Sequence, residues 1–144
     1  MSDLDSGQFD PGALEAEDAK LVTLARSARL RAYVPRGGDV AAEGAAVRDA
    51  DGRTYAAATM ENADGRLTVS ALRAAVAAAA SSGARRFEAA AVVSARVSLP
   101  DARRSPDTPD TPDADDLLTL GEFGAGVPVY LAGPDGVAHG RVTT

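Results

Sequence analysis

The fold of this chain is decided by residues 59–73, which read TMENADGRLTVSALR. Residues 59–66 predict a loop, because they carry turn-forming residues between two more regular segments. The alanine-rich run from Leu67 to Ser81 predicts a helix that ends at Gly83. Residues 59–81 therefore predict a loop followed directly by a helix.

On the N-terminal side, apolar residues at helical spacing predict a first helix over about residues 12–33. A proline and two glycines, at 35, 37 and 38, end that helix. The runs 44–48 and 53–58 flank Asp51-Gly52, a dipeptide that favours a tight turn. These residues therefore predict a β-hairpin between the first helix and the 59–66 loop.

On the C-terminal side, Phe87 to Ser94 is a continuous apolar run, as expected for a strand covered on both faces. Val127 to Leu131 has the same character, and Val137 to Val142 predicts a final strand. The expected order is helix, strand, strand, helix, strand, helix, strand, strand. This order predicts an α/β sandwich around a mixed five-stranded sheet.

The 144 residues predict one domain with a substantial core. Residues 1–10 carry three aspartates and predict a disordered acidic tail, which leaves 11–144 as the folded domain. Residues 95–112 contain the repeated triplet Pro-Asp-Thr, which favours an extended and solvated path. We interpret this segment as an acidic, proline-rich surface loop.

Composition excludes several function classes. The net charge of −6, without a basic patch, argues against a nucleic-acid partner. The chain has no cysteine, which excludes disulfides, thiolate nucleophiles and cysteine-bound zinc. No apolar run reaches the ~18 residues of a membrane span, and the acidic N-terminal residues do not resemble a signal peptide. We therefore expect a cytoplasmic protein that does not enter membranes.

Residues 59–63 followed by Ser70-Ala71-Leu72-Arg73 resemble the active-site segment of small cytidine deaminases. That family reads Asn-x-Glu-Asn-Ala and then Cys-Ala-Glu-Arg. Residues 32–35, 44–47 and 128–131 also resemble family segments, in the same order. The resemblance covers about residues 20–137 and implies the cytidine-deaminase-like three-layer sandwich around a mixed five-stranded sheet. It also implies a homo-oligomer, a dimer or the family's homotetramer, in which neighbouring chains complete each site.

The same resemblance shows where this chain departs from the family. The zinc-ligand positions align with Ser70, Asp113 and Asp116, and the proton-shuttle position aligns with Leu72. No cofactor is expected, because these residues supply neither thiolate nor imidazole to zinc. We therefore expect a cytidine deaminase-like pseudoenzyme, inactive in zinc-dependent deamination, that acts by binding or by oligomeric assembly.

Other roles are possible for the residues that differ from the family pattern. Asp113 and Asp116 are hard oxygen donors suited to Mg²⁺, Ca²⁺ or Mn²⁺ in an enzyme of altered chemistry. Equally, both could cap a helix, with Ser70 a small residue inside the preceding helix. Ser70 has no candidate base beside it in the sequence, so we do not expect a nucleophile there. The lone His139 is expected to be an ordinary surface residue.

A nucleoside ligand is the second alternative. By resemblance, Thr59, Glu61 and Asn62 occupy the family's ribose-binding segment, with Thr59 in place of the Asn. Ala41 and Glu43 stand where the family has Phe and Val, which removes an apolar contact and adds charge near the pocket. The competing explanation is that the Glu61 and Asn62 side chains satisfy backbone groups of the 59–66 loop.

Overall fold

The computed structural model describes residues 14–97 and 111–144. The predicted acidic tail, and all of the 95–112 loop except its two ends, lie outside the described residues. Five strands form one sheet in the order β3-β2-β4-β5-β6. They are β2 (Glu43–Asp49), β3 (Thr54–Ala58), β4 (Phe87–Ser94), β5 (Pro128–Ala132) and β6 (Ala138–Thr143). The pair β4–β5 is parallel and the other pairs are antiparallel, so the mixed five-stranded sheet is confirmed.

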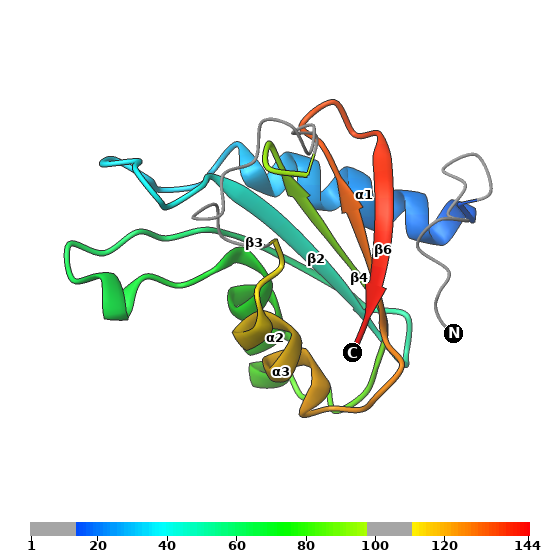
Figure 1. Cartoon of the computed structure of the whole chain (residues 1–144). Coiled ribbons are helices and arrows are strands. Elements are labelled where there is room, and N and C mark those ends of the chain that lie inside the picture. Colours follow the sequence, from blue (N-terminus) through cyan, green and yellow to red (C-terminus); the bar gives the residue numbers. More distant parts are fainter. Residues whose placement is uncertain (1–13, 98–110) are drawn as a thin grey trace.

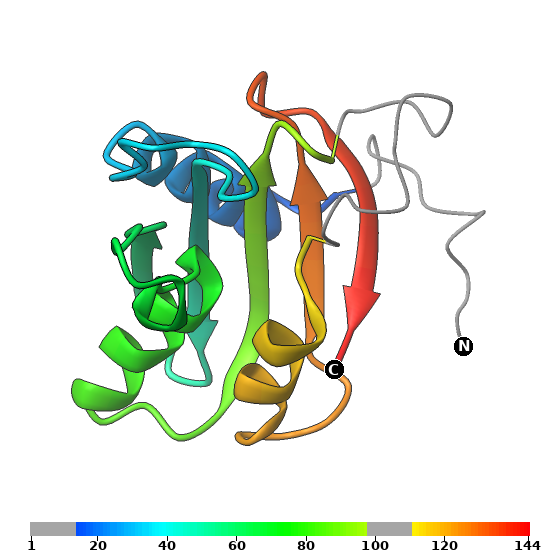
Figure 2. The same cartoon turned by 60° about the vertical axis from the view of Figure 1, so that its left-hand side comes forward.

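The helices cover the two faces of this sheet. Helix α1 (Ala16–Arg29) crosses one face, and α2 (Ala71–Ser81) and α3 (Ala114–Gly121) lie together on the other (Figure 1). Figure 2 shows α2 and α3 beside each other against the sheet. The three-layer α/β sandwich is therefore confirmed. None of the helices among the described residues combines the length and the apolar composition that crossing a membrane requires.

Each face of the sheet has its own core. One core packs β2, β4 and β5 against α2 and α3, with Leu72, Val76 and Leu120 fully buried. The other packs the opposite faces of the same strands against α1 through Leu21, Val22 and Ala25. Strand β4 is buried at every position except Glu88. Its continuous apolar run therefore predicted both its bounds and its two-sided burial.

Helix α1 lies very close to strand β2 at Gly44. A Cβ built on Gly44 would fall 2.0 Å from the Ala25 carbonyl oxygen and 2.5 Å from the Arg29 nitrogen. Only glycine allows this approach. Residues on the two sides of β2 alternate, so Gly44 and Ala46 face α1 while Glu43, Ala45 and Val47 face α2 and α3.

Two helix boundaries differ from the sequence prediction. Helix α1 ends at Arg29 rather than near residue 33, since the chain turns and Tyr33 pairs with Met60 in an isolated parallel bridge. Helix α2 begins at Ala71 rather than Leu67. A short 3-10 turn, Gly65–Leu67, occupies the earlier residues. The cap at Ser70, described below, is the physical reason for the later start.

Candidate functional site

The N-termini of α2 and α3 carry the residues that the resemblance singles out. Ser70 is the N-cap of α2, and its Oγ accepts a hydrogen bond from the Arg73 backbone nitrogen at 3.2 Å. The expectation that Ser70 lies inside the helix is therefore wrong. Asp113 is the N-cap of α3, and its carboxylate accepts from the Asp116 nitrogen at 2.9 Å. Hydroxyl and carboxylate caps satisfy backbone donors that a helix start leaves free.

Side chains of the two helix starts meet directly. Ser70 Oγ donates to Asp116 Oδ1 at 2.5 Å and accepts a hydrogen bond from Arg73 Nε at 3.2 Å. Arg73 Nε lies 3.5 Å from the same Asp116 oxygen. We call Ser70, Arg73, Asp113 and Asp116 the Ser70 cluster. The expectation that Ser70 has no basic group beside it is corrected, because the Asp116 carboxylate comes from a distant part of the chain.

The hydroxyl of Ser70 has no capacity left for chemistry. A serine hydroxyl offers one donor and two acceptor positions. Asp116 takes the donor, while the Arg73 backbone nitrogen and Arg73 Nε fill the two acceptor positions. Two cationic or polar donors on the oxygen also withdraw electron density from it. These contacts give the hydroxyl a structural role, as the cap of α2 and as the link to the start of α3.

Asp116 is the buried centre of the cluster, with 4% of its surface exposed. Its second oxygen accepts from the Asp113 nitrogen at 3.3 Å, which completes a capping box. Burial raises the pKa of the Asp116 carboxyl, and the neighbouring Asp113 charge adds to the rise. The hydrogen bond from Ser70 acts in the opposite direction. The expected capping role of Asp113 and Asp116 is thus confirmed.

Leu72 belongs to the apolar core. The residue is 1% exposed and packs with Ala75 and Val76 in the core beneath α2. Its side chain has no group that could carry a proton. The position that the resemblance assigns to a proton shuttle is therefore part of the apolar core in this chain.

Glu43 forms a second polar group beside the cluster. Its Oε2 accepts hydrogen bonds from Ser94 Oγ at 2.7 Å and from Thr111 Oγ1 at 2.9 Å. Ser94 is its direct partner across the β2–β4 ladder. Burial is the main cause of the raised pKa of the Glu43 carboxyl; Arg96 lowers this pKa and the charge of Asp116 raises it further. Two buried carboxyls, Glu43 and Asp116, therefore share one region of the structure.

The side chains of the predicted nucleoside-binding residues accept hydrogen bonds from backbone nitrogens. Thr59 Oγ1 accepts from the Glu43 nitrogen at 3.0 Å, which places it next to the Glu43 group. Glu61 is 7% exposed, and its carboxylate accepts from the Arg36 nitrogen at 2.9 Å. Asn62 Oδ1 accepts from the Asp64 nitrogen at 2.8 Å within its own turn. Asn62 thus bonds within the 59–66 loop, as the competing explanation expects, whereas Glu61 bonds to a backbone group of the loop that contains Arg36.

Sequence reasoning did not identify the partners of Glu43 or the role of Arg73. Thr111 and Glu43 are 68 positions apart, and Ser94 is 51 positions from Glu43. Nothing in a local pattern links such residues. The available signal was indirect: a charged residue at the start of a strand that is otherwise apolar on that face needs polar partners on the neighbouring strand.

The raised carboxyl pKa values predict how stability depends on pH. An acid whose pKa is higher in the folded than in the unfolded chain binds more protons when folded, so its ionisation destabilises the fold as pH rises. We expect the Tm of the wild type to rise by a few degrees as pH falls from neutral toward about 4.5, the ordinary range of a glutamate carboxyl, because the folded chain binds these protons at higher pH than the unfolded chain does. Differential scanning calorimetry in matched buffers measures this.

Two variants test whether Glu43 causes this dependence of the Tm on pH. Glu43→Gln should flatten the rise, since it removes a buried titrating group whose pKa is raised. Glu122→Gln, at an exposed position, should leave the rise unchanged. A wild-type Tm that falls steadily over the same range would contradict the buried-carboxyl interpretation.

The cluster does not fit a zinc ion. Zinc sites use thiolate, imidazole and carboxylate ligands, and here the three positions offer a hydroxyl and two carboxylates. The hydroxyl and the Asp116 carboxylate are already joined to each other and to Arg73. Residues 14–97 and 111–144 contain no group of three or more His, Cys, Asp or Glu side chains placed to hold a metal. His139 is an exposed residue of β6.

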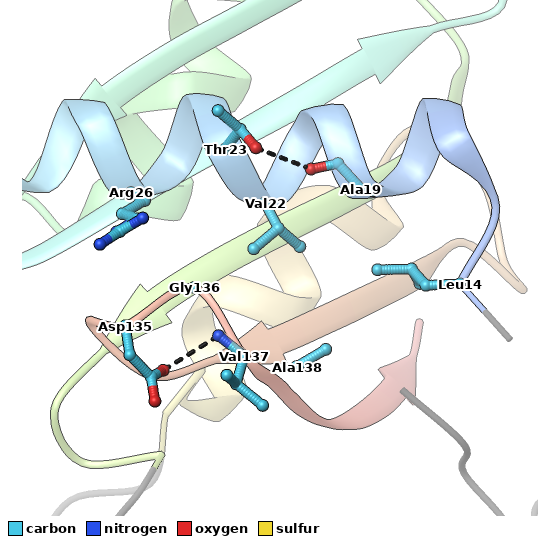
Figure 3. Close-up of a pocket in the computed structure, with 9 residues that line it drawn as sticks. All are labelled: Leu14, Ala19, Val22, Thr23, Arg26, Asp135, Gly136, Val137 and Ala138. Atoms are coloured by element: carbon cyan, nitrogen blue, oxygen red, sulfur yellow. Dashed lines mark hydrogen bonds between the residues drawn. The ribbon is translucent and has the colours of Figure 1, made fainter. Parts of the chain in front are cut away.

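A cavity of about 500 Å³ lies on the opposite face of the sheet, between α1 and the β5–β6 turn. Figure 3 shows Val22 and Thr23 of α1 above it and the Asp135–Gly136 turn below. Its two charged side chains are exposed and locally bonded: Arg26 Nε donates to the Pro134 carbonyl, and Asp135 accepts from the Val137 nitrogen. No buried polar group there requires a ligand, so the cavity does not compete with the cluster.

Comparisons with known proteins agree with this fold. A family model described as cytidine deaminase-like matches residues 14–136. The structure is similar to a cytidine deaminase from Burkholderia pseudomallei, with a TM-score of 0.66, 27% identity, and coverage of 87% of this chain and 89% of that one. A cytidine deaminase from Mycobacterium tuberculosis aligns with a TM-score of 0.60, 28% identity, and coverage of 84% and 87%.

A third similar structure is a cytidine deaminase from Mycobacterium leprae, with a TM-score of 0.61 and coverage of 86% of this chain and 90% of that one. Its 22% identity supports the fold alone. A search of curated protein sequences finds no significant match. The likeness therefore rests on the family model and on three-dimensional structure.

Proposed function

Because this chain belongs to the cytidine deaminase-like family, we propose that it is a member without zinc-dependent deamination that acts by binding or by homo-oligomeric assembly. One observation carries the proposal: the Ser70 hydroxyl has its donor and both acceptor positions engaged within the Ser70 cluster. A hydroxyl engaged in this way must lose hydrogen bonds to its neighbours before it can offer a lone pair to a metal ion.

The chemistry of the reaction supports the same conclusion. Zinc deaminases of nucleobases need a metal-activated water and a carboxylate that transfers protons. The shuttle position is Leu72, a core residue with 1% exposure. Asp116 and Glu43 cannot take over this role from where they lie, because both accept hydrogen bonds from hydroxyl groups that hold them in place. We propose that no cofactor is required.

Exposed apolar side chains support assembly as the mode of action. Tyr33 is 57% exposed, Met60 48% and Leu67 54%. Tyr33 and Met60 lie on neighbouring loops, which hydrogen bonds between Tyr33 and residues 59 and 61 hold together. The alanines of α2 contribute less than its composition suggests, since Ala71, Ala75 and Ala79 lie in the chain's own core. A dimer or tetramer formed through exposed apolar residues is our proposed assembly.

The experiment measures metal, activity and mass on one preparation of the full chain. Metal content is determined by plasma mass spectrometry after expression in zinc-supplemented medium. Deamination of cytidine and deoxycytidine is followed by absorbance, with an active cytidine deaminase as positive control. We expect less than about 0.1 zinc per chain and no deamination above the buffer blank. Stoichiometric zinc, or turnover that a chelator abolishes, would overturn the proposal.

The mass is measured by size-exclusion chromatography with light scattering at micromolar concentration. We expect a discrete mass of two or four chains. A monomer across the whole concentration range would contradict assembly and leave binding of another molecule as the function to pursue. Met60→Glu, which places a charge on the exposed loop surface, should lower the mass, while Glu17→Gln on exposed α1 surface should not.

A further inference from the structure

The Ser70 cluster joins two helices whose starting residues are far apart in the chain. Ser70 and Asp116 are separated by 46 positions. Ser70 caps α2, and Asp116 lies in the first turn of α3, so the bond between them connects one helix start to the other. Arg73 approaches both, from the first turn of α2. One hydrogen bond and one ion pair therefore bridge the two helices at a single point.

Helix α3 has few other anchors. It spans eight residues, Ala114–Gly121, and only Asp116 and Leu120 are fully buried in it. A helix of this length is not stable on its own, so its position depends on contacts with the rest of the domain. Leu117 is partly buried against the core, and Leu118 is 73% exposed. Asp116 is thus one of two buried side chains that hold the helix in place, and it is the polar one.

Arg73 is positioned by a third contact. Its Nη2 donates to the Thr68 carbonyl at 3.3 Å while its Nε points at Ser70 and Asp116. The guanidinium thereby lies between the loop before α2 and the start of α3. Its positive charge also lowers the pKa of Asp116, against the larger effect of burial. A planar group with several fixed donors can make these contacts together, which a lysine ammonium cannot do in the same geometry.

We infer that the Ser70–Asp116 hydrogen bond, supported by Arg73, is a metal-free cross-link that fixes α3 against α2. This inference rests on the proposed function, since a metal bound at these residues would displace the hydrogen bond. It assigns positioning roles to Ser70, Arg73 and Asp116 and makes none of them catalytic. The cross-link predicts that breaking the bond from the α2 side loosens α3, although Ser70 belongs to neither α3 nor its cap.

A double-mutant cycle on the full chain tests the cross-link. Ser70→Ala and Asp116→Ala each remove one partner of the bond and should each lower the Tm by roughly 5 to 12 °C, as expected for a buried hydrogen bond to a charged group. The double variant should be less destabilised than the sum of the two by at least about 3 °C, because the second change removes a bond already broken. Asp115→Ala is the matched control, an exposed aspartate one residue away, with an expected change below about 2 °C.

Hydrogen exchange supplies a second readout. In Ser70→Ala, amide protons of residues 117–120 in α3 should exchange at least about ten times faster than in the wild type. Ser70→Thr keeps the hydroxyl and should keep both the Tm and the α3 protection close to wild type. If Asp116→Ala fails to fold, the comparison of Ser70→Ala with Ser70→Thr still tests the cross-link.

The outcomes separate this inference from the proposed function. Additive Tm losses, or faster exchange confined to α2 in Ser70→Ala, would overturn the cross-link and leave the absence of deamination untouched. Stoichiometric zinc in the purified chain, with a Tm that drops on chelation, would overturn both. A zinc-free chain with coupled losses and an α3 that loosens from the α2 side supports the inference.

Discussion

Leu72→Glu lowers the Tm by roughly 10 °C or more in our first prediction, a loss of at least about 3 kcal/mol of unfolding free energy. This change introduces glutamate at the position that, by resemblance alone, aligns with the family's proton shuttle. Leu72 is 1% exposed and surrounded by the apolar side chains of its core. A carboxylate placed there loses its water without gaining a partner, and the cavity left by the leucine adds to the cost.

The variant is measured by thermal and denaturant unfolding, alongside the cytidine deamination assay. Leu72→Met keeps volume and polarity and is the matched control, with an expected loss below about 1.5 kcal/mol. We expect no deamination from either variant. A Leu72→Glu protein with wild-type stability would contradict the prediction, because it would mean that the new carboxylate reaches a hydrated or hydrogen-bonding region beside the Ser70 cluster.

The second large effect is expected for Gly44→Ala. A Cβ at this position would lie 2.0 Å from the Ala25 carbonyl oxygen, 2.5 Å from the Arg29 nitrogen and 2.9 Å from the Arg29 Cα. All three are backbone atoms of α1, so no side-chain rotation relieves the clash and the whole helix must move away from the sheet. We expect a loss of roughly 3 kcal/mol or more, near the upper end of the cost of overpacking.

Gly140→Ala is the control, because Gly140 also lies in a strand and has no heavy atom within 4 Å of its Cβ position. Its Tm should change by less than about 2 °C. Denaturant unfolding of both variants measures the difference. Equal stability of Gly44→Ala and wild type would mean that α1 can shift from β2 at no cost, which would contradict the close packing of the α1 core.

The sequence predicted the fold well where its signals are local and continuous. Residues 87–94 were assigned as a two-sided strand with the observed bounds, because apolar residues fill both faces. The hairpin at Asp51-Gly52 followed from turn chemistry that acts within four residues. The predicted start of α2 was wrong, because a single side-chain contact decides where this helix begins. Residues 67–70 were predicted to be helical, yet Ser70 is the N-cap and the helix begins at Ala71, four residues after the predicted start.

The site could be predicted only in part. Alignment with a family motif identified Ser70, Leu72, Asp113 and Asp116, and the capping alternative for both aspartates followed from ordinary helix chemistry. The Ser70–Asp116 bond could not be foreseen, because it joins two helices through the tertiary fold. The same holds for Glu43, whose partners Ser94 and Thr111 come from a neighbouring strand and from the residues before α3.

The hydrogen bonds of the Ser70 hydroxyl also constrain which substitutions this position can accept in evolution. A return to thiolate chemistry would begin with Ser70→Cys, and that first step weakens the donor on which the buried Asp116 depends. A zinc site would need further changes at 113 and 116 before a metal could repay the loss of order between α2 and α3. Replacing Ser70 would therefore lower the stability of the fold before any metal site could form.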